Sequence, residues 1–564
     1  MKSLLIALPT LLFLALGFGV SPGLAQLTRP VKGGVATGPA EVELSEVTAF
    51  GRREVVAYEI LPYGDDFFVS THTSGARLAS GGRPELMSLR LHRYDDQLER
   101  TGELEVAWPD EAREHISVVS LGDALLWTFT TPGRQRNTFD LRAEVLDGDG
   151  QLVSGHDLAT VELRDLDGFA EFEAYSASRD YYLRVYADET DSSLFSKRDE
   201  ERATVTIAVF ARTGEVVSIE RKRLRVTRDQ LEIQSVAVDD AGRAFVLAKV
   251  YSGSKGRETR RGSDSKVYLY TLEPGDDDPE RTELKLAGQY IEGISLVPGP
   301  TGAPAIVGVY TERIDGRIVG YFSTDRPADG LVLKPKPFSQ ELLAELGPRV
   351  TSGREGRLEL EGQYEFGDAL RLSDGRLTLL LESITIFQDF TRPGVGVGVG
   401  GVGFPGAGGE LRYTFGEGLL LTFGSDGELD EALMVPMGQR FRLQQGFNVS
   451  RRRALAFVPP YYRMRLVEYD GKPAAIYNDN PKNFGRDLTK RTKALRFGDA
   501  MATLAFADER GRLAQQPLFA RREADKVILI PGSAERLAND DVVFLATRFR
   551  TFGKNEVRFG RIRR

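Results

Sequence analysis

The sequence contains few of the side chains that form catalytic or metal sites. It has no cysteine and four histidines, none of which is spaced from another as metal ligands are: His72, His92, His115 and His156. The zinc-protease motif H-E-x-x-H is absent, and the serine-hydrolase motif G-x-S-x-G is absent beyond residue 25. Without cysteine the chain forms no disulfide, thiolate nucleophile or cysteine-ligated metal site. We therefore predict no catalytic residue, no metal site and no cofactor.

Two glycine-rich segments match short motifs outside the structural context that those motifs need. Ser252–Lys255 reads S-x-x-K, but that chemistry requires serine and lysine on one helical face, and the surrounding sequence predicts a loop. Residues 398–403 read G-x-G-x-x-G inside a Gly/Val-rich stretch, 394–409, rather than between a strand and a helix. We interpret this stretch as a hairpin insertion, with a phosphate-binding loop as the weaker alternative.

Two oxygen-rich segments are compatible with calcium binding. Residues 147–150 (DGDG) lack the glutamate that ends an EF-hand loop, so a hairpin turn is the better interpretation. Residues 478–480 (NDN) lie at a strand end before a long loop. There the side chains either bind a ligand or, as we expect, satisfy backbone amides.

Two loops are basic in an otherwise acidic protein of formal net charge −8. Residues 252–264 carry four Lys/Arg and two Asp/Glu residues. Residues 478–496 carry six Lys/Arg and two Asp/Glu residues. Such loops suit an anionic partner: an acidic glycan, a lipid phosphate or an acidic protein patch. The predicted ligand-binding residues are Arg257, Arg260, Arg261, Lys482, Arg486, Lys490 and Arg491. The alternative is that these loops are ordinary polar surface.

The elements that must position these loops repeat along the chain. Each repeat has two short strands joined by a Gly/Asp turn, a longer loop, and two more strands joined by a second turn. The fourth repeat shows the pattern in strands 231–238, 244–251, 266–272 and 283–286. Repeats begin near residues 54, 115, 170, 231, 289, 364, 461 and 525. This predicts an all-β fold, a β-propeller of eight (alternatively seven) four-stranded blades, whose long middle loops share one face.

The first and last parts of the chain complete this scheme. The last repeat has three clear strands, so we expect a strand near 41–47 to supply the fourth and close a domain of residues 26–564. A short helix at 340–346, capped by Ser339, is inserted between blades. Residues 1–25 have the pattern of a signal peptide, with an uncleaved membrane anchor as the alternative. We expect an exported, monomeric protein of the periplasm, cell surface or medium, with no transmembrane segment in the mature chain.

Four segments in the C-terminal part of the chain are distinctive: 470–483 (DGKPAAIYNDNPKN), 425–429 (SDGEL), 372–382 (LSDGRLTLLLE) and the short helix. Through these segments, residues 337–564 resemble secreted β-propeller proteins of Bacteroidota. The resemblance implies an exported propeller and no particular reaction, because this group is largely uncharacterised.

Charge and fold together favour one class of function. With 74 basic and 82 acidic residues, the chain has no global basic field, so we expect no nucleic acid partner. We predict a binding or scaffold protein of the cell envelope, whose partner is a protein or an anionic glycan, and not an enzyme. The alternative is a carbohydrate-active hydrolase or lyase in the central pocket, which would require carboxylates, or a Tyr/His/Arg cluster, converging there.

Overall fold

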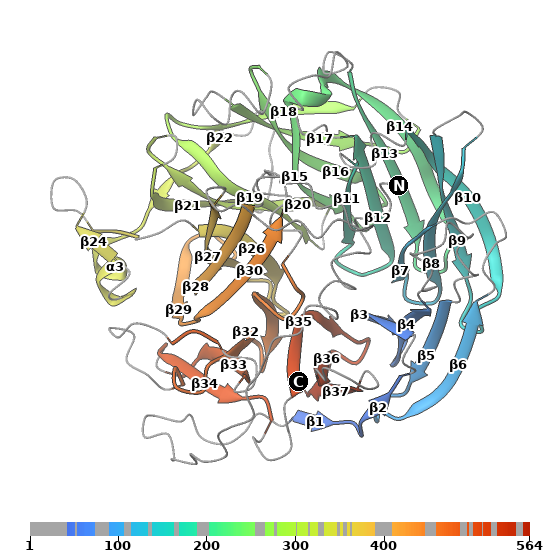
Figure 1. Cartoon of the computed structure of the whole chain (residues 1–564). Helices are drawn as coiled ribbons and strands as arrows, with labels where there is room; N and C mark the ends of the chain where they lie inside the picture. The colour runs from blue at the N-terminus through green and yellow to red at the C-terminus, as the bar shows by residue number, and fades with distance from the viewer. Residues whose placement is uncertain are drawn as a thin grey trace.

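A computed structural model gives the fold for most of the chain (Figure 1). It describes residues 42–50, 54–73, 89–106, 114–133, 138–162, 169–188, 202–253, 265–275, 279–299, 302–313, 316–324, 332–346, 350–352, 358–360, 364–389, 409–445, 458–484, 493–495, 500–509, 511–519, 527–548 and 556–563. The predicted signal peptide, residues 1–25, lies outside them. No helix in these residues is long and apolar enough to cross a membrane.

The first four blades follow one another along the chain. Blade one holds β3 (Glu54–Tyr63), β4 (Asp66–Thr73), β5 (Leu89–Tyr94) and β6 (Arg100–Val106); blade two holds β7 (Glu114–Ser120), β8 (Leu125–Pro132), β9 (Thr138–Leu146) and β10 (Leu152–Glu162). Blade three holds β11 (Phe169–Tyr175), β12 (Tyr181–Asp188), β13 (Arg202–Ala211) and β14 (Val216–Thr227). After the 3-10 helix η2 (Arg228–Gln230), blade four holds β15 (Leu231–Val238), β16 (Ala244–Tyr251), β17 (Ser265–Leu272) and β18 (Glu280–Leu286), with β22 (Val332–Leu333) parallel to β18.

The last four blades complete the ring. Blade five holds β19 (Tyr290–Gly299), β20 (Gly302–Thr311), β21 (Ile318–Thr324) and β23 (Lys336–Pro337); blade six holds β26 (Tyr364–Arg371), β27 (Leu377–Asp389), β28 (Gly409–Phe423) and β29 (Leu429–Val435), with β30 (Gln439–Gln445) also on β28. Blade seven holds β31 (Met464–Tyr469), β32 (Lys472–Asp479), β33 (Met501–Ala507) and β34 (Leu513–Pro517). Blade eight holds β35 (Val527–Arg536), β36 (Val542–Arg548), β37 (Glu556–Ile562) and, from the other end of the chain, β1 (Val42–Leu44).

The fold class predicted from the sequence is confirmed, with eight blades and not seven. The first strands of the eight sheets begin within three residues of the predicted repeat starts. These first strands, β3, β7, β11, β15, β19, β26, β31 and β35, lie nearest the centre of the ring (Figure 1). Gly/Asp turns make the repeat regular: in the turn before β16, Asp239 Oδ1 accepts hydrogen bonds from two backbone amides, and Gly242 adopts a φ of 81°.

The seam between the two ends of the chain lies in blade eight. Both β1 and β2 (Thr48–Ala49) pair antiparallel with β37, as in the register Val42↔Ile562 (Figure 1). Arg561, which is buried, forms an ion pair with Glu43 across this seam. The edge of β37 is therefore covered by the N-terminal segment.

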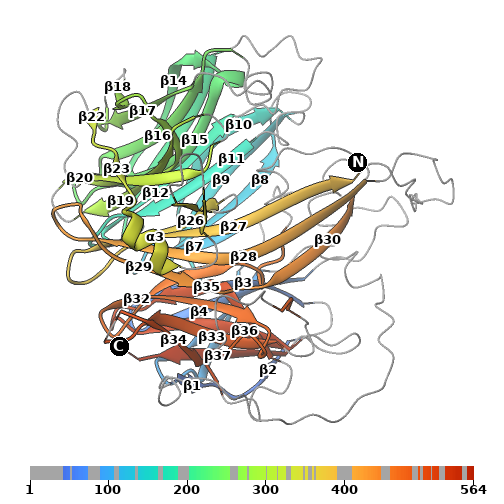
Figure 2. The same cartoon turned by 90° about the vertical axis from the view of Figure 1, so that its left-hand side faces the viewer.

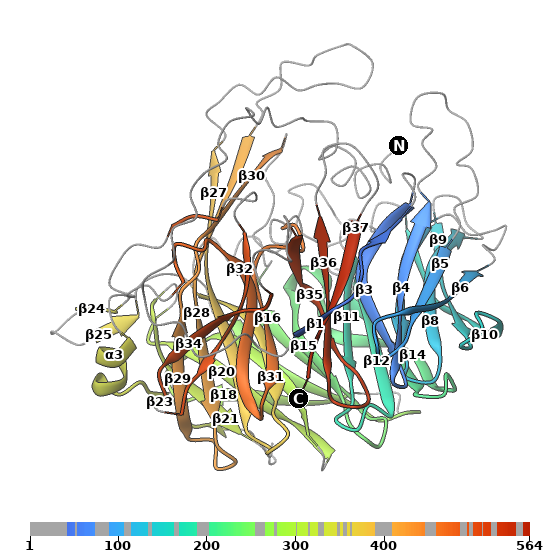
Figure 3. The same cartoon turned by 90° about the horizontal axis from the view of Figure 1, so that it is seen from below.

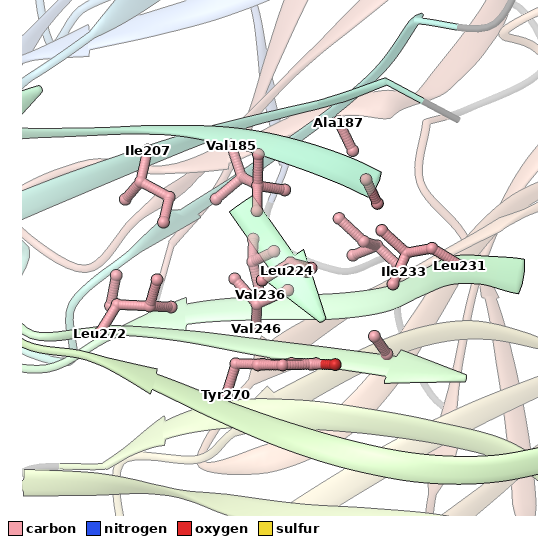
Figure 4. Close-up of a cluster of buried hydrophobic side chains, with 14 of the residues drawn as sticks. Val185, Ala187, Ile207, Leu224, Leu231, Ile233, Val236, Val246, Tyr270 and Leu272 are labelled. Carbon is pink, nitrogen blue, oxygen red and sulfur yellow. The ribbon is translucent and has the colours of Figure 1, made fainter. Parts of the chain in front are cut away.

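The core consists of apolar clusters between adjacent blades. Figure 4 shows one of them, in which Val185 and Ile207 of blade three face Val236, Val246 and Tyr270 of blade four. Burying one aliphatic side chain of this kind stabilises the fold by about 2 kcal/mol. Each blade is thus held mainly by its two neighbours, which fixes the inner strands around the ring.

The predicted short helix is present between blades five and six. Helix α3 (Gln340–Leu346) begins after Ser339, whose Oγ accepts a hydrogen bond from the amide of Leu342 at 3.1 Å. Leu343 and Leu346 pack against blades five and six. A hairpin that the sequence did not predict follows, made of β24 (Val350–Ser352) and β25 (Leu358–Leu360).

Candidate functional site

Only one of the predicted ligand-binding residues lies in the described part of the chain. Lys482 is exposed, just after β32. The other six lie outside the described residues: Arg257, Arg260, Arg261, Arg486, Lys490 and Arg491. Lys493, at the far end of the blade-seven loop, is also exposed. The predicted basic loops therefore stay a prediction.

The NDN segment, 478–480, has a structural role at the base of the blade-seven loop. The Asn478 side chain donates to the carbonyls of Tyr461 and Leu529 and accepts from the Leu529 amide, at 2.9, 2.7 and 3.0 Å. Asn480 Nδ2 donates to the carbonyl of Ala494 at 2.8 Å. These contacts satisfy backbone groups, which agrees with the interpretation preferred from the sequence.

Asn483 and Asp479 close the same loop base. The Asn483 side chain donates to the Lys493 carbonyl at 2.7 Å and accepts from the Lys493 amide at 2.6 Å. It also donates to Asp479 Oδ1 at 2.9 Å, whereas the buried Asp479 Oδ2 has no hydrogen-bond partner among the described residues. Burial raises the pKa of Asp479 to about 7, against hydrogen bonds that lower it.

The blade-seven loop is joined to a projecting part of blade six. The amide of Leu495 donates to the carbonyl of Gly438 at 2.5 Å, and Gln439 Nε2 donates to the carbonyl of Asn478 at 2.7 Å. Gly438 immediately precedes β30, and Gln439 is the first residue of that strand. Both segments therefore belong to one surface on the middle-loop face.

That projecting part is a three-stranded ribbon, which we call the blade-six arm: residues 384–389 of β27, 409–415 of β28, and β30. It extends beyond the other strands of the ring (Figures 2 and 3). The Gly/Val-rich stretch 394–409, interpreted from the sequence as a hairpin insertion, lies between β27 and β28, and all of it except Gly409 lies outside the described residues. On one side of the ribbon, Ile384, Tyr413 and Phe441 pack into the apolar core shared by blades six and seven. This packing supports the part of the strands that projects beyond the ring.

The other side of the arm is polar and basic. Cross-strand pairing places Phe387, Arg412 and Arg442 in one row, and Thr414 and Arg440 in the next. Among the described side chains of this face, three are arginines and one is a carboxylate, Glu410, which contacts Arg412 at 2.8 Å and Arg442 at 3.6 Å. Phe387 is 56% exposed and Arg442 is 70% exposed.

A second candidate site lies at the ring centre, where inner strands carry β-bulges. The pairing register skips between Ile233 and Ser235 in β15, between Ile291 and Gly293 in β19, and between Phe366 and Asp368 in β26. The skipped residues therefore have no partner in the ladder, and a bulge turns such residues away from the sheet. They are Gln234, Glu292 and Gly367.

A pocket of about 280 Å³ lies at this level between blades four, five and six. All three skipped residues line it, together with Gly293, Ile294, Val309, Tyr364, Glu365 and Phe366. Two of these residues are carboxylates, two are aromatic, and none is Lys, Arg or His.

Opposite charges join the inner strands at the ring centre, between neighbouring blades and, in one case, across the ring. The Arg465 guanidinium lies 3.2 Å from Asp368 Oδ2 and 3.8 Å from Glu535 Oε1. Arg179, in the first turn of blade three, lies 3.6 Å from Glu535 Oε2 and donates to the carbonyl of Arg536 at 2.8 Å. Because blades three and eight are not neighbours, this last contact spans the middle of the ring. Burial raises the pKa of Glu535, and Arg465 and Arg179 oppose the rise.

Glu59 is the other perturbed carboxyl group at the ring centre. Glu59 lies where the register of β3 skips between Val56 and Ile60. Its side chain is exposed to solvent at the ring centre, although protein atoms surround it on most sides. Partial removal from water raises the pKa of Glu59 to about 7, Glu173 adds to the rise, and Arg184 opposes it. Such a carboxyl group exchanges its proton near neutral pH.

The described residues contain no group of three or more His, Asp or Glu side chains arranged to hold a metal ion. Within the same residues His92 is buried and contacts Thr71 Oγ1 at 2.9 Å, so it belongs to the packed interior of blade one.

The sequence reasoning missed both the arm face and the ring-centre carboxylates. The arm had a readable signal, because Arg440, Phe441, Arg442 and Leu443 alternate polar and apolar residues as a half-buried strand does. The ring-centre carboxylates had no such signal in the sequence, because the position of a β-bulge depends on how a strand pairs with its neighbour.

Neither a protein-family model nor a curated protein matches the chain in sequence. Among solved structures, it is similar to the β-propeller domain of the Trilobed protease from Pyrococcus furiosus, with 10% identity and a TM-score of 0.31 over 84% of this chain and 97% of that one. It is also similar to a Synechocystis apocarotenoid oxygenase variant, with 13% identity and a TM-score of 0.29 over 69% of this chain and 74% of that one. A third similar structure is the Pyrococcus horikoshii acylaminoacyl peptidase, with 7% identity and a TM-score of 0.31 over 88% of this chain and 58% of that one. At these values the likeness carries no functional argument.

Proposed function

We propose that this protein is an exported binding protein of the cell envelope that holds an anionic glycan on its middle-loop face. The observation that carries the proposal is the outer side of the blade-six arm, where Arg412, Arg440 and Arg442 flank an exposed Phe387 on a protein of net charge −8. Guanidinium groups bind carboxylate and sulfate oxygens bidentately, and an aromatic ring packs against the apolar face of a sugar.

The neighbouring blade-seven loop base extends the same surface. Lys482 and Lys493 are exposed there, and the Leu495–Gly438 hydrogen bond joins the loop to the start of β30. Each exposed charge contact contributes about 0.2–1 kcal/mol, so useful affinity requires several of them together. Binding should therefore be salt-sensitive, because the Debye length falls from about 10 Å at 0.1 M salt to about 3 Å at 1 M.

The test uses polygalacturonate as the acidic glycan and dextran as the neutral one. A variant carrying Phe387→Ser, Arg440→Ser and Arg442→Ser should lose most retention on immobilised polygalacturonate at low salt. The matched control is Arg221→Ser with Arg223→Ser, which removes two exposed arginines from β14, the outer strand of blade three. Equal retention by the arm variant and the parent, or equal loss in the control, contradicts the proposal.

The predicted loops and the predicted export need separate tests. Replacing Arg257, Arg260, Lys490 and Arg491 with Ser should weaken retention on isolated envelope material at low salt. Cell fractionation should find the protein outside the cytoplasm with Gln26 as its first residue. Full retention by the loop variant argues against the loops, and an intact cytoplasmic chain beginning at Met1 argues against export.

A second candidate function is cleavage of an acidic polysaccharide at the ring centre, by hydrolysis or by the elimination reaction of a lyase. It is favoured by one specific observation, the raised pKa of Glu59 close to other carboxylates, because a glycosidase uses one protonated and one ionised carboxyl group. The test incubates the protein with polygalacturonate and measures new reducing ends. Release by the parent and at least a hundredfold slower release by Glu59→Gln would establish an enzyme. No release by the parent would exclude polygalacturonate as its substrate.

A further inference from the structure

The outer strand of blade three carries a row of arginines. In β14 the side chains of Arg221, Arg223 and Arg225 are exposed, whereas Lys222 and Leu224 between them are buried. Alternate residues of a strand point to opposite faces, so the three arginines share one face at a spacing of about 7 Å. Leu224, on the other face, joins the core that blade three shares with blade four. The row therefore lies on solvent at the outer margin of the ring (Figure 1).

Two of these arginines have no ionic partner. Within the described part of the chain neither Arg221 nor Arg223 forms an ion pair, whereas Arg225 has an interaction of its own. Their neighbour Lys222 differs, because it contacts Glu220 at 2.6 Å on the opposite face of the strand. One face of this stretch is thus electrically balanced, and the other carries a net positive charge.

A charged row on another outer strand is neutralised within its own blade. In β6 of blade one, Glu103 and Glu105 are likewise exposed at alternate positions. Arg90 on the adjacent strand lies 3.6 Å from Glu103 and 3.8 Å from Glu105. The row in β14 has no such compensation at Arg221 and Arg223, so its charge is available to a partner.

The backbone of β14 offers a second kind of contact. β14 is the last strand of its sheet, so one of its two edges pairs with no described strand. Its pairing with β13 is regular from Ser218 to Arg223, between two register shifts. Outward-pointing amides and carbonyls recur at every second residue of such an edge, as they do in any extended peptide. The edge thus offers main-chain hydrogen bonds in register with the two arginines.

The charge on this edge selects the kind of strand that can pair with it. Like charges that face each other across two strands are destabilising, so the arginines oppose pairing with the same strand of a second copy. The same rule favours a strand of opposite charge. An acidic polysaccharide would match the charges but lacks the regularly spaced main-chain groups that the edge can pair with, so an acidic peptide fits better.

We propose that the outer edge of β14 binds an extended acidic segment of a partner protein, which adds to blade three as a further strand. Carboxylates at alternate positions of that segment face Arg221 and Arg223. Its other side chains lie on the side of the Glu220–Lys222 pair, which has no net charge. The segment therefore needs acidic residues at every second position only. This surface is separate from the blade-six arm and does not depend on the proposed glycan binding.

Fluorescence anisotropy with the full-length protein tests the proposal, using a labelled peptide of about eight residues in which glutamate and threonine alternate. Binding should be saturable. A peptide of the same composition whose glutamates are consecutive should bind about tenfold more weakly, because fewer carboxylates would face the arginines. Arg221→Ser with Arg223→Ser should weaken binding of the alternating peptide about tenfold. The control, Lys285→Ser with Arg313→Ser, removes two exposed cations from blades four and five and should leave binding unchanged.

A charge-reversed variant gives an independent test. Arg221→Glu with Arg223→Glu should lose the acidic peptide and bind a peptide in which lysine and threonine alternate, which the parent should not bind. A gain of this kind cannot arise from misfolding. Circular dichroism and urea unfolding show whether each variant is folded.

Three results would overturn the proposal: no saturable signal with the alternating peptide, equal binding of the alternating and consecutive peptides, or full binding by the Arg221→Ser, Arg223→Ser variant. Self-association of that variant, without peptide binding by the parent, would show that the arginines only protect the edge. Loss of its retention on polygalacturonate, again without peptide binding, would assign the row to an acidic polysaccharide. The proposal expects full retention there, so failure here and failure of the glycan proposal are distinguishable.

Discussion

Replacing Asp479 with Asn should stabilise the protein at neutral and alkaline pH. The Asp479 carboxyl group is 2% exposed, its Oδ1 accepts from Asn483, and its Oδ2 is buried without a hydrogen-bond partner among the described residues. An ionised carboxylate is costly in such a place, and burial accordingly raises its pKa from 3.8 to about 7. Asparagine has nearly the same shape, stays neutral at every pH and keeps the oxygen that Asn483 contacts.

The size of the effect follows from linkage. Because the folded-state pKa of Asp479 lies above the unfolded value, the native state holds the proton more tightly. The benefit of protonation is complete below about pH 4 and is lost as the pH rises through 7. Each pKa unit corresponds to about 1.4 kcal/mol, so the cost of the ionised group approaches about 4 kcal/mol above pH 7. After ordinary structural relaxation we expect the Asp479→Asn variant to gain about 2 kcal/mol at pH 8 and almost nothing at pH 4.

Equilibrium unfolding in urea at a series of pH values from 4 to 8 measures this difference. The matched control is Asp65→Asn, which removes the same charge from an exposed turn in blade one and should change stability little at any pH. A gain in the Asp479 variant that does not vary with pH would show that ionisation is not its cause. A loss of stability at pH 8 would refute the reasoning, because it would mean that the charged form is favourable in the fold.

Three further changes test the architecture. Deleting residues 42–49 uncovers the edge of β37 and should lower the thermal midpoint by at least about 5 °C in calorimetry; an unchanged midpoint would argue against the seam. Asn478→Ala removes hydrogen bonds between blades seven and eight and should cost about 3 kcal/mol in urea unfolding, whereas a cost below about 0.5 kcal/mol would contradict their role. Gly560→Ala places a Cβ atom in steric overlap with the edge of the Phe544 ring and should cost about 3 kcal/mol or prevent folding, whereas Gly532→Ala, with nothing within 4 Å, should be tolerated.

The repeat architecture was predictable because its signals are local. Glycine and aspartate mark each tight turn, as at Gly64 and Gly375, where φ is 60° and 89°, and only a few residue types accept such angles. Strands between those turns alternate or run apolar according to whether one or both faces are buried. The helix at 340–346 was equally local, since its cap and apolar face lie within eight residues.

The candidate sites were less predictable because they depend on non-local pairing. Glu59 and Glu292 look like ordinary surface residues of alternating strands, and only a skipped register turns them toward the ring centre. Asp368 and Glu535 lie far apart in the sequence and meet through Arg465. In contrast, the role of Asn478 could be anticipated from its place at a strand end, although its partners could not.

The seam in blade eight also has a consequence for the order of folding. The four main strands of each of blades one to seven lie close together in the sequence, so each of these blades can form from one local segment, although β22, which lies between β21 and β23 of blade five, pairs with β18 of blade four. Blade eight pairs Val42 with Ile562, which lie 520 residues apart, and closing so long an unfolded loop would cost about 5–6 kcal/mol of chain entropy. Stacking of the earlier blades shortens that loop before the ends meet, so we expect closure to be the last and slowest step. The same seam then sets the rate of opening, because damage at either end of the chain releases the same pair of strands.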